Sequence, residues 1–277
     1  MAKDLLSTRE AAGVLGVGTT SIKRWADSGL LECVRTPGGH RRFPRQSVEA
    51  MLELHGGAPA NDGDTDGWLR LLIDGSGPTD VYKRLIRERI ALGGYVQVCE
   101  QLGAALYEMG ERWQAGELTI GQEHLAVERL HRGAARACED LVLAPDAARA
   151  LLATAEGEEH TIGLSLAELV LREAGWETRW CGRRTPFAAI RGFVAAGECS
   201  LVVISASAHS ADPEVLEDQA SRLAELCDKH NVHLVLGGSG SWPDSLVKVH
   251  RLRSYRGLAK MSVSFLQQDV PIGAEQS

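Results

Sequence analysis

The chain has 277 residues, of which 44% are hydrophobic, and a formal net charge of −7 at pH 7. This length allows one to three globular domains, and the lack of any run of eighteen apolar residues excludes a membrane-spanning helix. The six cysteines include no Cys-x-x-Cys pair, which argues against a disulfide framework and a zinc site and favours a reducing, cytoplasmic compartment.

The charge is unevenly distributed along the chain. Residues 1–55 carry a net charge of +2, whereas the remainder carries −9. Between Arg35 and Arg45 there are four arginines, one histidine and no acidic residue. A locally basic segment in an acidic protein predicts that this segment contacts a polyanion.

Residues 1–55 are predicted to form a winged helix-turn-helix. A capping box of Ser7 and Glu10 begins a helix from Thr8 to Leu15. After a glycine-containing turn, a second helix runs from Thr19 to near Gly29, which is the helix-turn-helix arrangement. A strand over 31–35, a basic hairpin over 36–43 and a third helix over 46–54 complete the prediction.

This segment resembles the DNA-binding domain of the MerR superfamily over about fifty residues, through Thr8-x-Glu-Ala-Ala-x-x-Leu-Gly-Val, Ile22-x-Arg-Trp, Gly29-Leu and Pro37-Gly-Gly-His-Arg-Arg-Phe. The resemblance implies that the second helix enters the major groove of double-stranded operator DNA and that the hairpin grips the flanking backbone. The expected groove contacts are Thr20, Ser21, Lys23 and Arg24, and the expected phosphate contacts, which position the domain, are Arg35, His40, Arg41 and Arg42. Trp25 and Phe43 are predicted to be local core residues.

The middle of the chain is predicted to be a linker followed by a helical bundle. Residues 56–67 are rich in Gly and Asp, which predicts a flexible linker. Residues 68–145 show apolar residues at three- and four-residue spacing, which predicts a four-helix bundle with helices over 68–73, 79–92, 95–113 and 119–141. A capping box of Thr119 and Gln122 places Glu123 and His124 in the first turns of the last helix.

Residues 146–277 alternate strand and helix, which predicts a doubly wound parallel sheet of the α/β class. Strands are expected over 150–155, 177–180, 201–205, 233–236 and 249–252. Three of them are followed by short motifs: Glu158-Glu159-His160-Thr161-Ile162-Gly163, Ser205-Ala206-Ser207 and Gly237-Gly238. Because ligands bind outside the carboxyl ends of the strands in such sheets, the motifs predict one crevice.

The three motifs resemble the signature of the Rossmann-like cobalamin-binding domain of corrinoid enzymes and sensors, Asp-x-His-x-x-Gly, Ser-x-Leu and Gly-Gly. Glu158 replaces the Asp, and Ser207 replaces the Leu. The resemblance implies that His160 is the lower axial ligand of cobalt, that Glu158 orients its ring, and that the nucleotide tail of the cofactor lies between the other two motifs. The cofactor-binding residues expected here are Glu158, His160, Gly163, Ser205, Ser207, Gly237 and Gly238.

Trp113 and the pair Glu123-His124 are spaced in a way that resembles the bundle of light-sensing, adenosylcobalamin-dependent MerR-type repressors of the CarH/LitR type. The resemblance implies that Trp113 covers the upper face of the cofactor and that Glu123 and His124 line the same pocket. It also implies a cytoplasmic repressor, not an enzyme, whose dark tetramer binds operator DNA. Light would then cleave the cobalt–carbon bond, dissociate the tetramer and release the DNA.

Two other functions stay open at this point. One is a corrinoid methyl carrier, against which the DNA-binding segment argues. The other is a MerR-type regulator that senses cobalamin or another ligand without light. The intact His160 argues against a bundle and sheet that sense something else or assemble without a cofactor. Gln114 also leaves the cobalt ligation after illumination open, because some light-sensing relatives have a histidine at this position.

Overall fold

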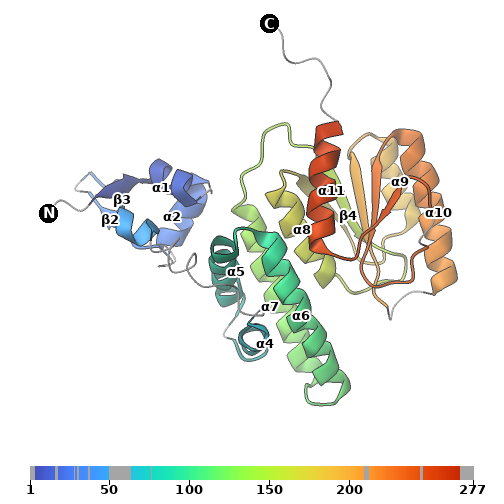
Figure 1. Cartoon of the computed structure of the whole chain (residues 1–277), viewed down its shortest axis with the longest axis horizontal. Helices are drawn as coiled ribbons and strands as arrows, with labels where there is room; N and C mark the ends of the chain where they lie inside the picture. The colour runs from blue at the N-terminus through green and yellow to red at the C-terminus, as the bar shows by residue number, and fades with distance from the viewer. Residues whose placement is uncertain are drawn as a thin grey trace, which may run out of the picture. The chain divides into compact units, whose positions relative to one another are not determined.

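The computed structural model describes residues 4–15, 18–27, 29, 31–36, 38–49, 64–75, 77–208, 212–243 and 246–268. The chain divides into two compact units, Met1–Val142 and Leu143–Ser277, whose elements are labelled in Figure 1. No helix in the described part of the chain is long and apolar enough to cross a membrane.

The described residues from 4 to 49 form a winged helix-turn-helix, as predicted. A three-stranded antiparallel sheet has the order β1-β3-β2, with β1 at Leu5–Ser7, β2 at Val34–Arg35 and β3 at Arg41–Pro44. Helices α1 (Thr8–Leu15) and α2 (Thr19–Asp27) follow β1. The predicted capping box is confirmed, since the Ser7 amide donates to Glu10 Oε2 at 2.7 Å and the Glu10 amide donates to Ser7 Oγ at 3.3 Å.

Three details of this segment differ from the prediction. Strand β1 was not predicted; its Leu6 pairs with Phe43 of β3, and both side chains are buried, so the hairpin is anchored to the N-terminal segment. The strand expected over 31–35 is limited to Val34–Arg35. The third helix begins at Arg45. Its predicted end and residues 56–63 of the predicted linker lie outside the described residues.

The described residues from 64 to 142 form the predicted four helices, α4 (Thr65–Asp74), α5 (Pro78–Leu92), α6 (Tyr95–Gln114) and α7 (Ile120–Glu139). Helix α4 begins inside the segment predicted as linker, because Asp64 Oδ1 accepts the Gly67 amide at 2.9 Å and caps the helix. The capping box of Thr119 and Gln122 is confirmed at the start of α7. Large buried side chains such as Trp68, Tyr82, Tyr95 and Leu102 fill the bundle core.

The second unit contains the predicted doubly wound parallel sheet. Its strand order is β5-β4-β6-β7-β8, with bounds Glu177–Gly182, Arg149–Thr154, Leu201–Ser205, His233–Gly237 and Val249–Arg251. Helices α8 (Ile162–Glu173) and α11 (Tyr255–Gln268) cover one face, and α9 (Phe187–Ala195) and α10 (Pro213–His230) cover the other (Figure 1). Strand β4 lies between β5 and β6, so the topological switch point falls beside its carboxyl end.

The close packing of α7 on α5 can be tested by a substitution at Gly133. A Cβ atom added at Gly133 would lie 2.8 Å from Val81 Cγ1 and 3.1 Å from the Tyr82 amide nitrogen. We therefore expect Gly133→Ala to lower the free energy of unfolding by about 1–3 kcal/mol through overpacking. Gly103→Ala on α6 is the control, since no described atom beyond its chain neighbours and its own helix backbone lies within 4 Å of its added Cβ. It should raise stability by about 1 kcal/mol. Urea unfolding measures both, and equal effects would contradict the packing argument.

Candidate functional site

The register of the parallel sheet brings the three predicted motifs to one edge. Thr154, the last residue of β4, pairs with Ser205 of β6, and Ser205 in turn pairs with Gly237 of β7. The three strands therefore end level with one another. The loops that carry Glu158 and His160, Ser205 and Ser207, and Gly237 and Gly238 leave the sheet side by side at the switch point.

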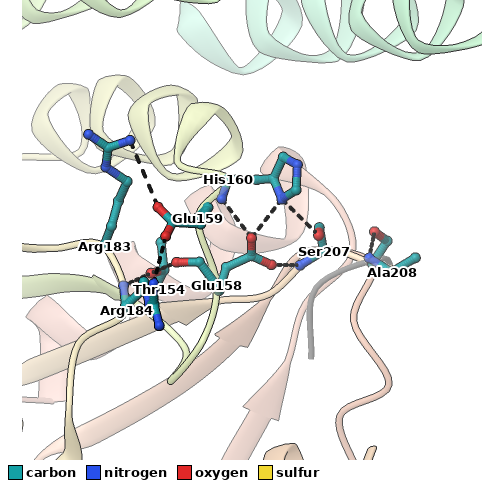
Figure 2. A network of polar contacts seen from close by, with 9 residues as sticks. Thr154, Glu158, Glu159, His160, Arg183, Arg184, Ser207 and Ala208 are labelled. Atoms are coloured by element: carbon teal, nitrogen blue, oxygen red, sulfur yellow. Dashed lines mark hydrogen bonds and ion pairs between the residues drawn. The ribbon is translucent and has the colours of Figure 1, made fainter. Parts of the chain in front are cut away.

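The centre of this edge is the contact between Glu158 and His160 (Figure 2). The Glu158 carboxylate is fully buried, and its Oε1 lies 2.7 Å from His160 Nδ1 and 2.6 Å from the His160 amide nitrogen. Because a carboxylate can only accept, Nδ1 of the neutral ring carries the proton and Nε2 keeps its lone pair. The His160 side chain is 63% exposed, so this nitrogen is available to a metal ion.

Ser207 supports the same pair from the neighbouring loop. Its amide donates to Glu158 Oε2 at 2.5 Å, and its Oγ lies 3.2 Å from His160 Nδ1. The residue that replaces the usual Leu thus places a hydroxyl beside the imidazole. Both oxygens of the buried Glu158 carboxylate are hydrogen-bonded, which satisfies the main requirement for burying a charge.

Sequence reasoning missed Thr154, which orders the loop beneath His160. Its buried Oγ1 donates to the Glu158 carbonyl at 2.8 Å and accepts the Arg184 amide at 2.9 Å (Figure 2). The one available signal was a hydroxyl-bearing residue at the end of an otherwise apolar strand. Glu159 lies outside this network and pairs with the Arg184 guanidinium at 3.2 Å.

The Gly-Gly motif is packed closely against the loop that follows β6. Gly238 has φ of +81°, and an added Cβ would lie 2.2 Å from the Ala206 carbonyl oxygen. The space beside this glycine is therefore filled by the neighbouring loop. Gly163 is different, since the nearest atom to its added Cβ is Tyr255 Oη at 3.9 Å. The open approach to the backbone lies at Gly163, at the start of α8.

Three further candidates lie at the α6–α7 connection of the bundle. Trp113 occupies the last turn of α6 and is 47% exposed, although tryptophan is usually buried. Glu123 and His124 lie near the start of α7, with His124 Nε2 3.6 Å from Glu123 Oε2. Gly116, with φ of +76°, makes the turn between the helices. An exposed aromatic at a helix end is available for contact with a ligand or another chain.

Some of the predicted DNA-contacting side chains are exposed, whereas others are hydrogen-bonded or ion-paired within the domain. Lys23 and Thr20 on α2 are exposed, as are Arg35 and His40 of the hairpin. Arg41 is engaged within the domain, where its Nη2 lies 2.6 Å from Asp27 Oδ1 and its Nη1 donates to the Lys23 carbonyl at 3.1 Å. Arg42 Nη1 donates to the Arg41 carbonyl at 3.0 Å. The side chain of Ser21 lies outside the described part of the structure.

Trp25, which was expected to be local core, connects α2 to the bundle instead. Its fully buried Nε1 donates to Tyr82 Oη at 2.6 Å and to Asp140 Oδ2 at 3.2 Å. Tyr82 Oη donates to the same Asp140 oxygen at 2.6 Å. Burial and the adjacent Asp140 carboxylate both raise the pKa of Tyr82, so the phenol stays a donor.

Arg24 extends this contact. Its Nη1 lies 3.1 Å from Asp140 Oδ1 and 3.3 Å from Glu139 Oε2, at the C-terminal end of α7. The Gly18 backbone also lies close to the Val142 side chain, since a Cβ added at Gly18 would lie 2.5 Å from Val142 Cγ2. Nη1 of Arg24, one of the predicted DNA contacts, is therefore engaged by these acids in this structure.

Known domain families match two parts of the chain. A helix-turn-helix domain model matches residues 5–54, and a B12 binding domain model matches residues 74–137. The monomethylamine corrinoid protein of Methanosarcina barkeri shares the fold, with a TM-score of 0.54 and 18% identity over 72% of this chain and 95% of that chain. The fold and the matched domains therefore define a cobalamin-binding transcriptional regulator.

Two repressors of Myxococcus xanthus are similar in sequence. The HTH-type transcriptional repressor CarH is 35% identical over 254 residues, which cover 78% of this chain and 83% of CarH. The HTH-type transcriptional repressor CarA is 32% identical over 139 residues, which cover 49% of this chain and 44% of CarA. The chain belongs to the CarH-type family of transcriptional repressors.

The buried carboxylate can be tested by an isosteric change. Glu158→Gln places an amide NH₂ where both carboxylate oxygens accept N–H groups, so one donor meets another. We expect a loss of about 1–3 kcal/mol in the free energy of unfolding, measured by urea denaturation. The control Glu159→Gln removes the same charge from a side chain that is half exposed, and it should cost about 0.5 kcal/mol or less. Equal losses would contradict the role given to Glu158.

The contact between α2 and the bundle can be tested through DNA affinity. Asp140→Asn keeps an acceptor for Tyr82 but removes the charge that holds Arg24. We expect binding to a labelled duplex of mixed sequence to tighten about 3- to 10-fold, as for the loss of one competing charged hydrogen bond. The control Glu128→Gln makes the same charge change at an exposed pair on α7. If both variants bound DNA equally, the contact would not restrain Arg24.

Proposed function

We propose that the protein is a light-responsive transcriptional repressor that uses adenosylcobalamin as its chromophore. The observation that carries the proposal is His160, held through Nδ1 by a buried carboxylate with its other nitrogen exposed at the switch point. One imidazole of this kind fits a cofactor whose ring supplies the other ligands of its metal. Membership of the CarH-type repressor family supports the same reading.

In this proposal the second unit holds the lower side of the cofactor. His160 would hold the cofactor through its cobalt, with Glu158 and Ser207 fixing the tautomer and direction of the His160 ring. Gly163, Ser205, Gly237 and Gly238 line the path of the nucleotide tail. When bound, the cofactor supplies visible absorption and a cobalt–carbon bond that light breaks.

The first unit supplies the upper wall and the DNA contacts. Trp113 presents an aromatic surface, and Glu123 and His124 offer polar groups near the same helix connection. Thr20, Lys23, Arg35 and His40 are exposed for DNA. A single small domain of this kind binds weakly, so we propose a homotetramer in the dark, in which linked domains reach effective concentrations of roughly millimolar. In this proposal the protein is cytoplasmic and acts on operator DNA there.

A second candidate is a repressor that responds to cobalamin itself and not to light. Gln114 favours this candidate, because a neutral amide is a poor cobalt ligand beside an imidazole and would leave the upper face without a protein ligand after illumination. The corrinoid methyl carrier has less support. The similarity to the monomethylamine corrinoid protein, at 18% identity, concerns the fold alone. The helix-turn-helix domain indicates a regulator.

Illumination and the lower ligand can be tested together. We expect the wild-type protein mixed with adenosylcobalamin in the dark to elute as a tetramer and to dissociate after green light. His160→Ala should lose the spectrum of histidine-ligated cobalamin and bind the cofactor at least 10-fold more weakly. His230→Ala, an exposed histidine at the end of α10, is the control and should behave as wild type.

The outcomes separate the candidates. Dissociation of the tetramer by light supports the photoreceptor. If cofactor binding and tetramer assembly did not change on illumination, the result would support the repressor that responds to cobalamin and not to light. An unchanged spectrum and affinity in His160→Ala would show that His160 is not the ligand, and the central assignment would then be wrong.

A further inference from the structure

Arg251 holds the glycine loop that follows β7. Its Cα is the register partner of Leu236 near the end of that strand. Its Nη1 donates to the carbonyls of Leu236 and Leu252, both at 3.1 Å. Its Nη2 donates to the carbonyls of Gly238 at 2.7 Å and Gly240 at 3.1 Å. One guanidinium therefore donates hydrogen bonds to four backbone carbonyls, and two of these carbonyls belong to the Gly-rich loop.

The loop that Arg251 holds is pressed against the loop after β6. The Gly240 amide donates to the Ala206 carbonyl at 2.9 Å, and the Ala206 amide donates to the Gly237 carbonyl at 3.2 Å. Ser239 Oγ accepts the Ala208 amide at 3.0 Å. Trp242 Nε1 also donates to the Gly237 carbonyl, at 2.9 Å. Residues 237–240 are therefore joined to the loop after β6 through hydrogen bonds at Ala206 and Ala208.

Only arginine suits this arrangement. Four acceptors around one planar group match the fixed fork of a guanidinium, whereas the ammonium of lysine offers three donors on a single point. The guanidinium also places a permanent positive charge behind the loop. A phosphate group on the other side of the loop would be stabilised by that charge, since opposite charges attract over such distances in a partly buried setting.

We propose that Arg251 is a positioning residue that makes the site selective for corrinoids with a nucleotide tail. The proposal rests on the proposed cobalamin-binding function and deepens it. The tail carries a phosphate and would lie along the loops that Arg251 arranges, whereas the corrin ring is held from His160. Arg251 acts through the loops and does not itself ligate the metal.

The test compares two corrinoids that differ only in the tail. We expect Arg251→Lys in the full chain to bind adenosylcobalamin about 10-fold more weakly, as expected when charged hydrogen bonds are lost. It should bind adenosylcobinamide, which lacks the nucleotide tail, with an affinity within about 2-fold of wild type. Arg149→Lys is the matched control, since Arg149 lies at the opposite, amino end of β4 and pairs with Glu177. It should change neither affinity.

A second measurement needs no cofactor. Hydrogen exchange of the amides in residues 237–242 should be faster in cofactor-free Arg251→Lys than in wild type, while the amides of β4 keep their protection. A thermal unfolding curve confirms that the variant is folded.

Each other outcome overturns the proposal in a recognisable way. Equal weakening for both corrinoids would give Arg251 a general structural role, and no weakening for either would remove its role in binding. If wild type bound neither corrinoid, the proposed cobalamin-binding function would fail, and the selectivity with it.

Discussion

The candidate site depends on one buried charge. Glu158 has no exposure to solvent, and it is stable there because it accepts hydrogen bonds from His160 and Ser207, on two different loops. Both loops leave adjacent strands at the same level. The carboxylate therefore connects the geometry of the sheet edge to the direction of one imidazole ring. Without it, His160 would be an ordinary exposed histidine on a loop.

The same physical principle operates in the first unit, with a different result. Asp140 is almost fully buried, and it accepts hydrogen bonds from Tyr82 and Trp25 while pairing with Arg24. A buried carboxylate needs such partners, and here two of them belong to the helix that is expected to read DNA. Helix α2 and the bundle are thus joined by a polar contact through Trp25 and Arg24.

Much of the fold could be predicted because it depends on local signals. Helix α1 and the starts of α7 and β6 follow from capping boxes and from runs of apolar residues, and their observed bounds agree with the prediction. The missed elements lack such signals. Strand β1 has three residues and exists because Leu6 pairs with Phe43, a partner far along the chain. The start of α4 was hidden in a Gly- and Asp-rich segment in which Asp64 is a cap.

The sequence by itself determined the family, the winged helix-turn-helix, the bundle, the parallel sheet and the three motifs at strand ends, because each depends on residue type and spacing along the chain. Only the tertiary structure decided which groups meet. It placed Thr154 beneath the Glu158 loop, filled the space beside Gly238 with Ala206, joined Arg251 to the Gly-rich loop and engaged Arg24 with Asp140. These contacts join residues from separate strands, helices and loops. Strand register and helix packing determine them, and neither leaves a local pattern in the sequence.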